Sequence, residues 1–473
     1  MDASRPAAAV AETHGSTVFF TADRALKVLK PVRTPFFDYS TPALRREACE
    51  REVELNRRLA PDVYLGTSPI FEHGVEADCM VVMRRLPSDR RLSALVGTPE
   101  FDALVAEVAH VVGTFHAGLP PDGAGAALST RDAVADLWTR QNLDDLDEHA
   151  APLLGADHLA EIRRRATRFL AGREPLFAAR ITAGHVVDGH GDLLADDIFC
   201  LPDGPRILDC LAFSDDLRRG DTAADLAFLA MDLERLAGPA AARVLVDAYV
   251  EATGDHVPGP LLHHWIAYRA LVRAKVRVMR AAQGDDRDCR VAADEARDFR
   301  DQCLRHLRAA TVTLTLVGGA PGTGKTTLAG RLGDGSDAVV LSSDEVRKDL
   351  AGVGRADHAG APLDAGLYDA TSTDATYAEL LRRAGDLLVM GWSVVLDASW
   401  SSAERRAAAA QVAARTSSEL EQFRCVLDPE AAARRIAARL ARGDDASDAT
   451  PDLSRELAAR FEPWPQATEF RTG

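Results

Sequence analysis

The stretch Gly318-Gly319-Ala320-Pro321-Gly322-Thr323-Gly324-Lys325-Thr326-Thr327 has the pattern G-x-x-x-x-G-K-[ST]. A β-branched run over residues 311–317 precedes it and predicts a buried strand, and an apolar run over residues 328–332 predicts a following helix. A strand, a glycine-rich loop and a helix N-terminus in this order favour bound phosphate, because backbone N–H groups and the helix dipole attract anions. We call residues 318–327 the phosphate cradle, and they predict a site for a nucleoside triphosphate.

The individual positions of the phosphate cradle have separate expected roles. The ammonium group of Lys325 is predicted to reach the β- and γ-phosphates of ATP, and the Thr326 hydroxyl to bind Mg²⁺. The remaining residues predicted to bind the nucleotide here are Gly319, Gly322, Thr323, Gly324 and Thr327.

Composition limits the class of protein. A chain of 473 residues is long enough for two or three domains. Its net charge of −16 makes nucleic acid an unlikely partner, and no apolar run is long enough to cross a membrane. The seven cysteines are scattered without a C-x-x-C pair, which predicts reduced thiols and a cytoplasmic protein.

The chain divides into two blocks. Strand-like alternation over residues 10–86 gives way to a mostly helical region over 97–307, and the strand before the phosphate cradle opens the second block. We predict one domain over residues 1–308, and a P-loop ATP-binding domain, of the kinase or AAA type, over residues 309–473. Residues 118–127 and 351–374 are predicted loops. One helix carries a basic cluster, predicted to be a charged face rather than a polyanion site: Arg269, Arg273, Lys275, Arg277 and Arg280.

Further polar residues follow strands of the second block. A strand-like run over residues 338–343 ends at Asp344, at the sheet edge where ligands bind, so this carboxylate is a candidate base for an incoming hydroxyl. The alternative is that Asp344 only caps a helix. Another strand-like run over residues 392–397 ends at Asp397, a candidate Mg²⁺ ligand. Arg435 and Arg439 lie four residues apart on one predicted helix face and are candidate phosphate clamps.

The second block resembles the polynucleotide kinase and zeta toxin branch of P-loop kinases. The resemblance covers residues 311–473 and rests on the phosphate cradle, on Asp344-Glu345-Val346-Arg347 and on the R-x-x-x-R pair. It implies that Asp344 is the catalytic base, that Arg347 holds the acceptor substrate and that the two later arginines belong to a lid over the phosphates.

The first block carries a second phosphotransfer signature. The sequence His190-Gly191-Asp192-Leu193-Leu194-Ala195-Asp196-Asp197 is followed by a short strand and by Asp209. Kinase catalytic loops have the form H-x-D-x-x-x-x-N, and the next strand ends in a metal-binding Asp. Asp192 is therefore the candidate base, and Asp197 and Asp209 are the candidate Mg²⁺ ligands. Because Asp197 stands where Asn is expected, it brings an extra negative charge to the transferring phosphoryl group.

This block resembles the aminoglycoside phosphotransferase and choline kinase-like family over residues 10–307. The resemblance rests on His190-Gly191-Asp192-Leu193 and on the segment 219–227, which is similar to the family's segment downstream of the metal-binding Asp. It implies that Lys27, in a strand, binds the nucleotide and pairs with Glu52, in a helix. Lys30 is the neighbouring candidate for the nucleotide lysine.

Together these features predict an α+β protein-kinase-like domain followed by an α/β P-loop NTPase domain with a parallel sheet. The expected activity is transfer of phosphate from ATP, with Mg²⁺, to a small hydroxylated molecule by two nucleotide-binding modules. Two alternatives remain. In one, the first domain is a degenerate kinase that binds a ligand and regulates the second domain. In the other, the second domain phosphorylates polynucleotide 5′ ends.

Overall fold

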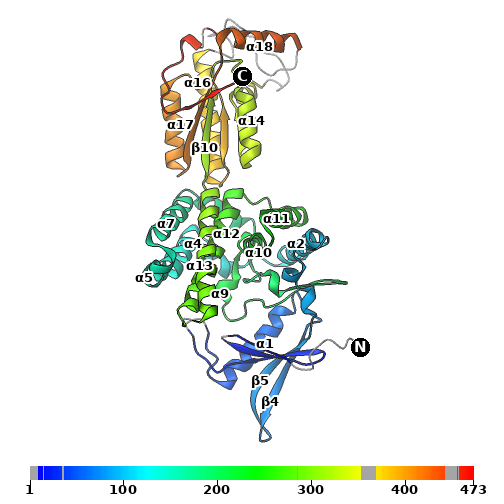
Figure 1. Cartoon of the computed structure of the whole chain (residues 1–473). Helices are drawn as coiled ribbons and strands as arrows, with labels where there is room; N and C mark the ends of the chain where they lie inside the picture. The colour runs from blue at the N-terminus through cyan, green and yellow to red at the C-terminus, as the bar shows by residue number, and fades with distance from the viewer. Residues whose placement is uncertain are drawn as a thin grey trace. The chain divides into compact units, whose positions relative to one another are not determined.

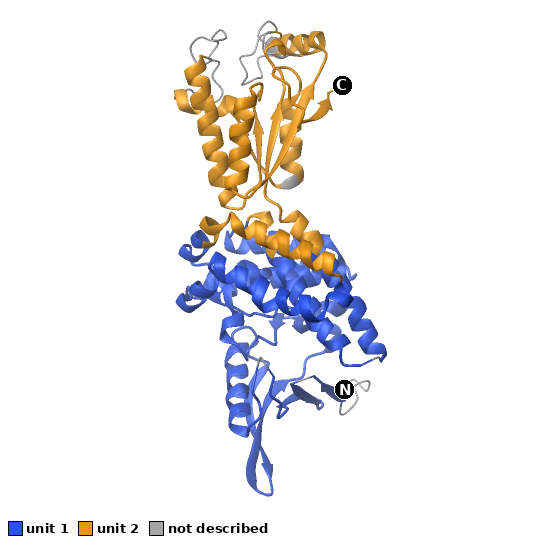
Figure 2. Cartoon of the chain, turned by 90° about the vertical axis from the view of Figure 1, so that its left-hand side faces the viewer, with its two compact units in different colours: residues 1–154, 178–257, 265–303 blue, residues 155–177, 258–264, 304–473 orange. Residues whose placement is uncertain are grey.

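The computed structural model describes residues 9–13, 15–34, 37–284, 286–352, 369–442, 455 and 458–472, without the side chains of residues 336 and 439–442 (Figure 1). Contacts divide the chain into two compact units (Figure 2). The first unit comprises residues 1–154, 178–257 and 265–303, and the second comprises residues 155–177, 258–264 and 304–473. The predicted domain boundary at 308/309 stays a prediction, and this division differs from it by placing residues 155–177, 258–264 and 304–308 in the second unit.

The first unit begins with a five-stranded antiparallel sheet in the order β1-β2-β3-β5-β4. Helix α1 (Pro42–Asn56) is capped by the Thr41 side chain and packs on this sheet through buried residues such as Cys49 and Val53. The strands are β1 (Ala9–Glu12), β2 (Ser16–Phe20), β3 (Arg24–Leu29), β4 (Tyr64–Glu72) and β5 (Val75–Arg84).

The rest of the first unit is mainly helical, with two short antiparallel strand pairs. Strand β6 (Val186–Asp188) pairs with β9 (Arg219–Asp221), and β7 (Ile198–Leu201) pairs with β8 (Gly204–Ile207). The predicted loop over residues 118–127 is wrong in part, because Asp122 accepts hydrogen bonds from two backbone N–H groups and so starts a helix, α3.

The helices of this region are α2 (Phe101–Gly118), α3 (Gly123–Leu128), α4 (Arg131–Trp138), α5 (Asp144–His149), α6 (Ala151–Leu154), α9 (Asp215–Arg218), α10 (Thr222–Ala237), α11 (Pro239–Thr253), and parts of α8 (Glu174–Thr182), α12 (Gly259–Ala281) and α13 (Arg287–Ala309). A π-helical turn, Thr139–Leu143, joins α4 to α5.

The second unit contains a five-stranded sheet in the order β11-β12-β10-β13-β14, and every pair in it is parallel. Of the strands that follow β10 in the chain, β11 and β12 lie on one side of it within the sheet, and β13 and β14 lie on the other. The strand order therefore reverses next to β10, and α/β sheets bind ligands at such a position. The strands are β10 (Thr313–Gly318), β11 (Val339–Ser342), β12 (Val394–Asp397), β13 (Glu419–Val426) and β14 (Thr468–Arg471).

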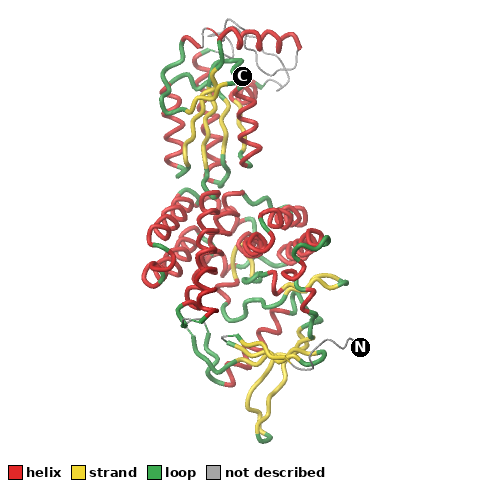
Figure 3. The backbone as a smooth tube through the Cα atoms, viewed as in Figure 1, coloured by secondary structure: helices red, strands yellow, loops and turns green. Residues whose placement is uncertain are grey.

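Helices lie on either side of these strands (Figure 3). They are α14 (Lys325–Ser336), α15 (Ser343–Ala351), α16 (Ala370–Val389), α17 (Ala403–Arg415) and α18 (Pro429–Arg442), and α7 (Ala156–Ala171) also belongs to this unit. Most of the predicted loop over 351–374 lies outside the described residues, but its end is wrong, because α16 already begins at Ala370.

The predicted fold class is confirmed: an α+β unit with a kinase-type antiparallel sheet and helix, and an α/β unit with a parallel sheet that carries the phosphate cradle. Among the described residues, no helix is both long enough and apolar enough to cross a membrane.

Candidate functional site

The phosphate cradle connects β10 to α14 through a loop that only glycine can form. Gly319, Gly322 and Gly324 have φ angles of 139°, 81° and 87°. A Cβ atom on Gly319 would lie 2.5 Å from the carbonyl oxygen of Cys425, and one on Gly322 would lie 2.8 Å from that of Ala432. The backbone is therefore packed tightly on one side, and α14 begins directly after it, at Lys325.

Two side chains of the cradle reach neighbouring groups. The Thr326 hydroxyl donates to Asp397 Oδ2 over 2.7 Å, and Lys325 Nζ donates to the carbonyl oxygen of Ala320 over 3.2 Å. Burial raises the pKa of Asp397, against the opposing effects of Lys325 and the Thr326 hydrogen bond. A hydroxyl and a carboxylate at this spacing form the hard-oxygen donor set that Mg²⁺ prefers, so these residues fit the predicted ion.

Asp344 lies at the start of α15, which follows the edge strand β11. The N-cap of this helix is Ser342, whose hydroxyl accepts a hydrogen bond from the Asp344 backbone N–H, so Asp344 is not the capping residue. Its carboxylate pairs with Arg347 Nη1 over 2.7 Å. Register pairs Ser342 with Asp397 on β12, so Asp344 follows the strand end next to that of Asp397.

The chain's last described residues contact the cradle. The Thr472 hydroxyl donates to the carbonyl oxygen of Thr323 over 2.9 Å and lies 3.4 Å from Arg435 Nη1, which donates to it. Arg435, on α18, is thus linked to the backbone of the cradle loop through the side chain of Thr472. The side chain of Arg439 lies outside the described residues, and Thr327 is an exposed residue of α14.

The first unit contains the predicted lysine–glutamate pair. Lys27 Nζ, on β3, lies 2.9 Å from Glu52 Oε1 on α1 and 3.3 Å from Asp209 Oδ1. Burial disfavours the charged lysine, but the two carboxylates outweigh it and raise the pKa of Lys27 well above its usual value. Lys30 instead pairs with Glu12 over 2.6 Å. Lys27 is therefore the lysine that faces the candidate metal ligand.

Residues 190–197, the H-G-D loop, are held by a carboxylate that the sequence did not single out. Asp225, on α10, accepts hydrogen bonds from the backbone N–H groups of His190 and Gly191 over 2.6 and 2.8 Å. His116 Nε2 lies 3.3 Å from the same carboxylate. The only sequence signal was the segment 219–227, which contains Asp225 but assigns it no role.

The ring of His190 fixes the next residue of the loop. Its Nε2 donates to the carbonyl oxygen of Leu208 over 3.1 Å, so the neutral ring leaves Nδ1 to accept from the backbone N–H of Asp192 over 3.3 Å. Burial lowers the pKa of His190 to about 4, consistent with a neutral ring. The H-G-D loop is thereby tied to the strand that precedes Asp209.

Three carboxylates, Asp192, Asp197 and Asp209, are close enough to influence one another. Burial raises the pKa of Asp192 to about 6, and burial together with the charges of Asp209 and Asp192 raises that of Asp197 to about 8. Lys27 instead lowers the pKa of Asp209, which is 56% exposed.

Cations that the sequence analysis did not assign to this site oppose these shifts. Arg273 and Arg269, from the basic cluster of α12, lower the pKa of Asp192, and Arg91 lowers that of Asp197. The prediction that the cluster forms only a charged helix face is therefore incomplete. Lys275, by contrast, forms an ion pair with Asp145 over 3.1 Å, as expected for a residue of a charged helix face.

No three His, Cys, Asp or Glu side chains within the described ranges are grouped closely enough to hold a metal by themselves. A nucleotide-bound Mg²⁺ takes only one or two carboxylates from the protein, and the remaining ligands are phosphates and waters. The pair formed by Asp197 and Asp209 and the pair formed by Thr326 and Asp397 have that composition.

The chain is similar to known proteins over almost its whole length. It is 43% identical over 458 residues to an uncharacterized protein of Mycobacterium tuberculosis, and the match covers 96% of this chain and 90% of that protein. This chain belongs to the family of that mycobacterial protein. In addition, residues 314–464 match the sequence profile of the AAA domain.

Solved structures with some similarity to this chain include two kinases. A choline/ethanolamine kinase family protein from Mesorhizobium loti is 16% identical with a TM-score of 0.40, and the match covers 65% of this chain and 93% of that one. A sugar kinase from Janibacter sp. is 16% identical with a TM-score of 0.26, and the match covers 34% of this chain and 84% of that one.

Proposed function

We propose that this protein is an ATP-dependent phosphotransferase that acts on a small hydroxylated molecule and has two nucleotide-binding modules. The observation that carries the proposal is the phosphate cradle with its hydrogen bond of 2.7 Å between Thr326 and Asp397. The AAA-domain match over residues 314–464 supports nucleotide binding by the same unit.

In the second module, the cradle backbone and Lys325 bind the phosphates of ATP, and Lys325 leaves Ala320 to reach them. Thr326 and Asp397 are the residues that would hold Mg²⁺, which when bound supplies positive charge to the phosphate oxygens. Asp344 accepts the proton of the acceptor hydroxyl, and Arg347 is released from Asp344 to bind the acceptor. Arg435 and Arg439 close over the phosphates. Catalysis of this kind depends mainly on positioning and on neutralising charge.

In the first module, Lys27, oriented by Glu52, binds the nucleotide phosphates, and Asp209 and Asp197 would hold Mg²⁺. Asp192 orients or accepts the proton of the acceptor hydroxyl. Because its pKa is raised to about 6, it is mainly ionised at neutral pH and can act as a base.

The cysteines, all free and buried, support a cytoplasmic protein with reduced thiols.

One alternative has a specific observation in its favour. Burial, and after it the charges of Asp209 and Asp192, raise the pKa of Asp197 to about 8, and carboxylates this close together oppose the approach of a nucleotide. In this alternative the first module is a degenerate kinase that binds a ligand and regulates the second. Polynucleotide 5′-kinase activity has less support, because the net charge of −16 repels nucleic acid.

The test is ATP turnover by the full-length chain against sugars, amino alcohols, aminoglycosides and a 5′-hydroxyl oligonucleotide. The parent is compared with Asp192→Ala, Lys325→Ala and the control Asp247→Ala, which removes an exposed carboxylate of α11.

Loss of acceptor phosphorylation in both site variants, but not in the control, supports two active modules. Loss in Lys325→Ala alone favours the regulatory alternative. An oligonucleotide product that Arg347→Ala abolishes would favour the polynucleotide kinase. If the parent phosphorylates nothing in the panel, the proposal fails for these acceptor classes.

A further inference from the structure

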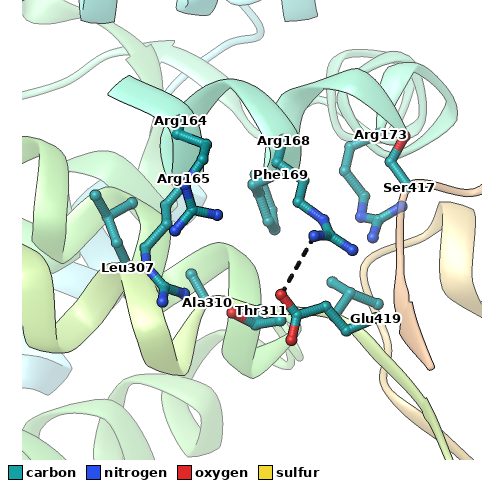
Figure 4. A pocket seen from close by; sticks show the side chains of 11 residues that line it. Arg164, Arg165, Arg168, Phe169, Arg173, Leu307, Ala310, Thr311, Ser417 and Glu419 are labelled. Atoms are coloured by element: carbon teal, nitrogen blue, oxygen red, sulfur yellow. Dashed lines mark ion pairs between the residues drawn. The ribbon is translucent and has the colours of Figure 1, made fainter. Parts of the chain in front are cut away.

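A basic pocket lies in the second unit, away from the phosphate cradle. Its lining comes from α7, from the end of α13 with the start of the β10 segment, and from the segment before β13, and all of these belong to that unit. The lining residues are Arg164, Arg165, Arg168, Phe169, Arg173, Leu307, Ala310, Thr311, Val312, Ser417 and Glu419 (Figure 4).

The charge of this pocket is opposite to that of the chain as a whole. Four arginines line it against one glutamate, in a protein of net charge −16. Arg168 Nη1 pairs with Glu419 over 3.4 Å, and Arg165 Nε pairs with Glu161, outside the lining, over 2.8 Å. Neither Arg164 nor Arg173 forms an ion pair with any carboxylate that the structure describes.

Arg173 is the clearest sign that a negative charge is missing. Its side chain is fully buried, with a relative exposure of 0%, and its Nη1 donates to the carbonyl oxygens of Gly172 and Thr416 over 2.9 and 2.7 Å. Its Nη2 lies 3.4 Å from the Ser418 hydroxyl, and its Nε has no hydrogen-bond acceptor. A buried cation normally has a charged partner, because neutral carbonyls offset little of its lost hydration. Accordingly, burial lowers the pKa of Arg173 to about 10.

The pocket wall is held in place by close backbone contacts. A Cβ atom on Gly172 would collide with the carbonyl oxygen of Thr416, so the end of α7 is pressed against the segment before β13. Arg168 Nη2 also donates to the carbonyl oxygen of Ser418 over 3.3 Å. Figure 4 shows the arginine side chains extending from α7 toward Thr311 and Glu419. The basic groups are therefore preorganised on one wall.

The other part of the pocket lining is mainly apolar. Phe169, Leu307 and Val312 are buried or nearly so, with exposures of 5%, 2% and 3%, and Thr311 and Ser417 add hydroxyl groups. A free inorganic anion would use the arginines and hydroxyls only. A phosphate ester would also use the apolar part.

We propose that this pocket binds the phosphate group of a small phosphate monoester, with the organic part of the ligand against Phe169, Leu307 and Val312. Two arginines without carboxylate partners match the charge of a dianionic phosphate, and guanidinium groups suit phosphate geometry. The inference is independent of the proposed phosphotransferase activity.

This site is separate from the phosphate cradle. The pocket lies where the β10 segment begins, at Thr311 and Val312, whereas the cradle begins at Gly318, where β10 ends. A strand rises about 3.3 Å per residue, so the two ends are about 20 Å apart. A small ester in the pocket therefore does not touch a nucleotide in the cradle, and ATP does not compete with it.

The test is calorimetric titration of the full-length chain at low salt with phenyl phosphate, inorganic phosphate and phenol. The double variant Arg164→Ala/Arg168→Ala removes two exposed lining arginines and leaves Arg173 in its structural contacts. The control is Arg415→Ala, an exposed arginine at the end of α17 beside Thr416 but outside the lining. A Lys325→Ala version separates this site from the cradle.

We expect phenyl phosphate to bind the parent more tightly than inorganic phosphate does, and phenol not to bind. The double variant should bind it about tenfold more weakly or worse, as expected for lost charge-assisted contacts, while Arg415→Ala stays within about twofold. Binding should survive Lys325→Ala and saturating ATP. No binding by the parent, equal binding by parent and double variant, or loss in Lys325→Ala would each overturn the proposal, and equal affinity for inorganic phosphate would overturn its ester part.

Discussion

The H-G-D loop should lose its fixed shape when Asp225 is replaced by Asn. Asp225 accepts two backbone N–H groups, those of His190 and Gly191, one on each carboxylate oxygen. Asn keeps one oxygen but turns an NH₂ group toward the other N–H, so one donor loses its acceptor. A hydrogen bond to a charged acceptor contributes about 1.5–3 kcal/mol, and an orphaned buried donor costs about 1–3 kcal/mol. We therefore expect a local cost of about 3 kcal/mol.

Hydrogen exchange measures this cost where it arises. A change of about 3 kcal/mol raises the local opening equilibrium about 100-fold, so amides of residues 190–192 should exchange about 100-fold faster in Asp225→Asn. The measurement is mass-spectrometric exchange of peptides that cover the H-G-D loop, with Asp247→Asn on α11 as the control. An increase below about threefold in Asp225→Asn, or an equal increase in the control, would refute the role assigned to Asp225.

The same contact predicts a pH dependence. Burial opposes ionisation of Asp225, but the hydrogen bond and charge of His116 outweigh it and hold its pKa well below the usual value of about 3.9. The lowered pKa means that its stabilisation is complete above about pH 4 and disappears as the pH falls through the lower, folded-state pKa. The difference in loop exchange between parent and Asp225→Asn, corrected for intrinsic rates, should thus be constant above pH 5 and shrink below about pH 4. A difference that grows on acidification would contradict this assignment.

Two further substitutions test the packing of each unit. Gly319→Ala should abolish binding of a fluorescent ATP analogue to the cradle, because its Cβ would lie 2.5 Å from a carbonyl oxygen, whereas Gly330→Ala on α14 meets open space and should bind normally with unchanged or higher thermal stability. Arg180→Lys should destabilise the first unit by about 3 kcal/mol in chemical unfolding, because a lysine cannot bridge Asp221 and Asp255 as the buried guanidinium does. Normal analogue binding by Gly319→Ala, or wild-type stability of Arg180→Lys, would contradict these arguments.

The phosphate cradle was predictable from the sequence because all of its parts are adjacent along the chain. The strand, the three glycines with positive φ and the helix that starts at Lys325 follow one another within residues 313–336. The Lys27–Glu52 pair is different, because 25 positions separate the two residues and only the family resemblance joined them. Its observed distance of 2.9 Å confirms the pairing, and its role in catalysis stays a prediction.

What the sequence did not predict depends on packing between distant segments. Asp225 is 35 positions from His190, and nothing local distinguishes it from an ordinary helix carboxylate. The arginines of α7 carry no motif, and only the approach of Thr311 and Glu419 turns them into a pocket. Likewise, Arg269 and Arg273 were predicted to form a charged face, because helix periodicity does not reveal that a carboxylate such as Asp192 lies nearby.

The two candidate sites differ in how their charges are balanced, and this bears on which of them turns over. In the first unit, Lys27 faces both Glu52 and Asp209, Asp192 adds a further carboxylate, and burial together with the charges of Asp209 and Asp192 raises the pKa of Asp197 to about 8. In the cradle, Asp397 accepts a hydrogen bond from the Thr326 hydroxyl; burial raises its pKa, and Asp344 is the one described carboxylate that adds to this rise. Phosphate carries several negative charges, so it is repelled more at the first site unless metal ions neutralise the carboxylates. Nucleotide binding to the first unit should therefore need Mg²⁺ more strictly than binding to the cradle, where backbone N–H groups and Lys325 supply the positive charge.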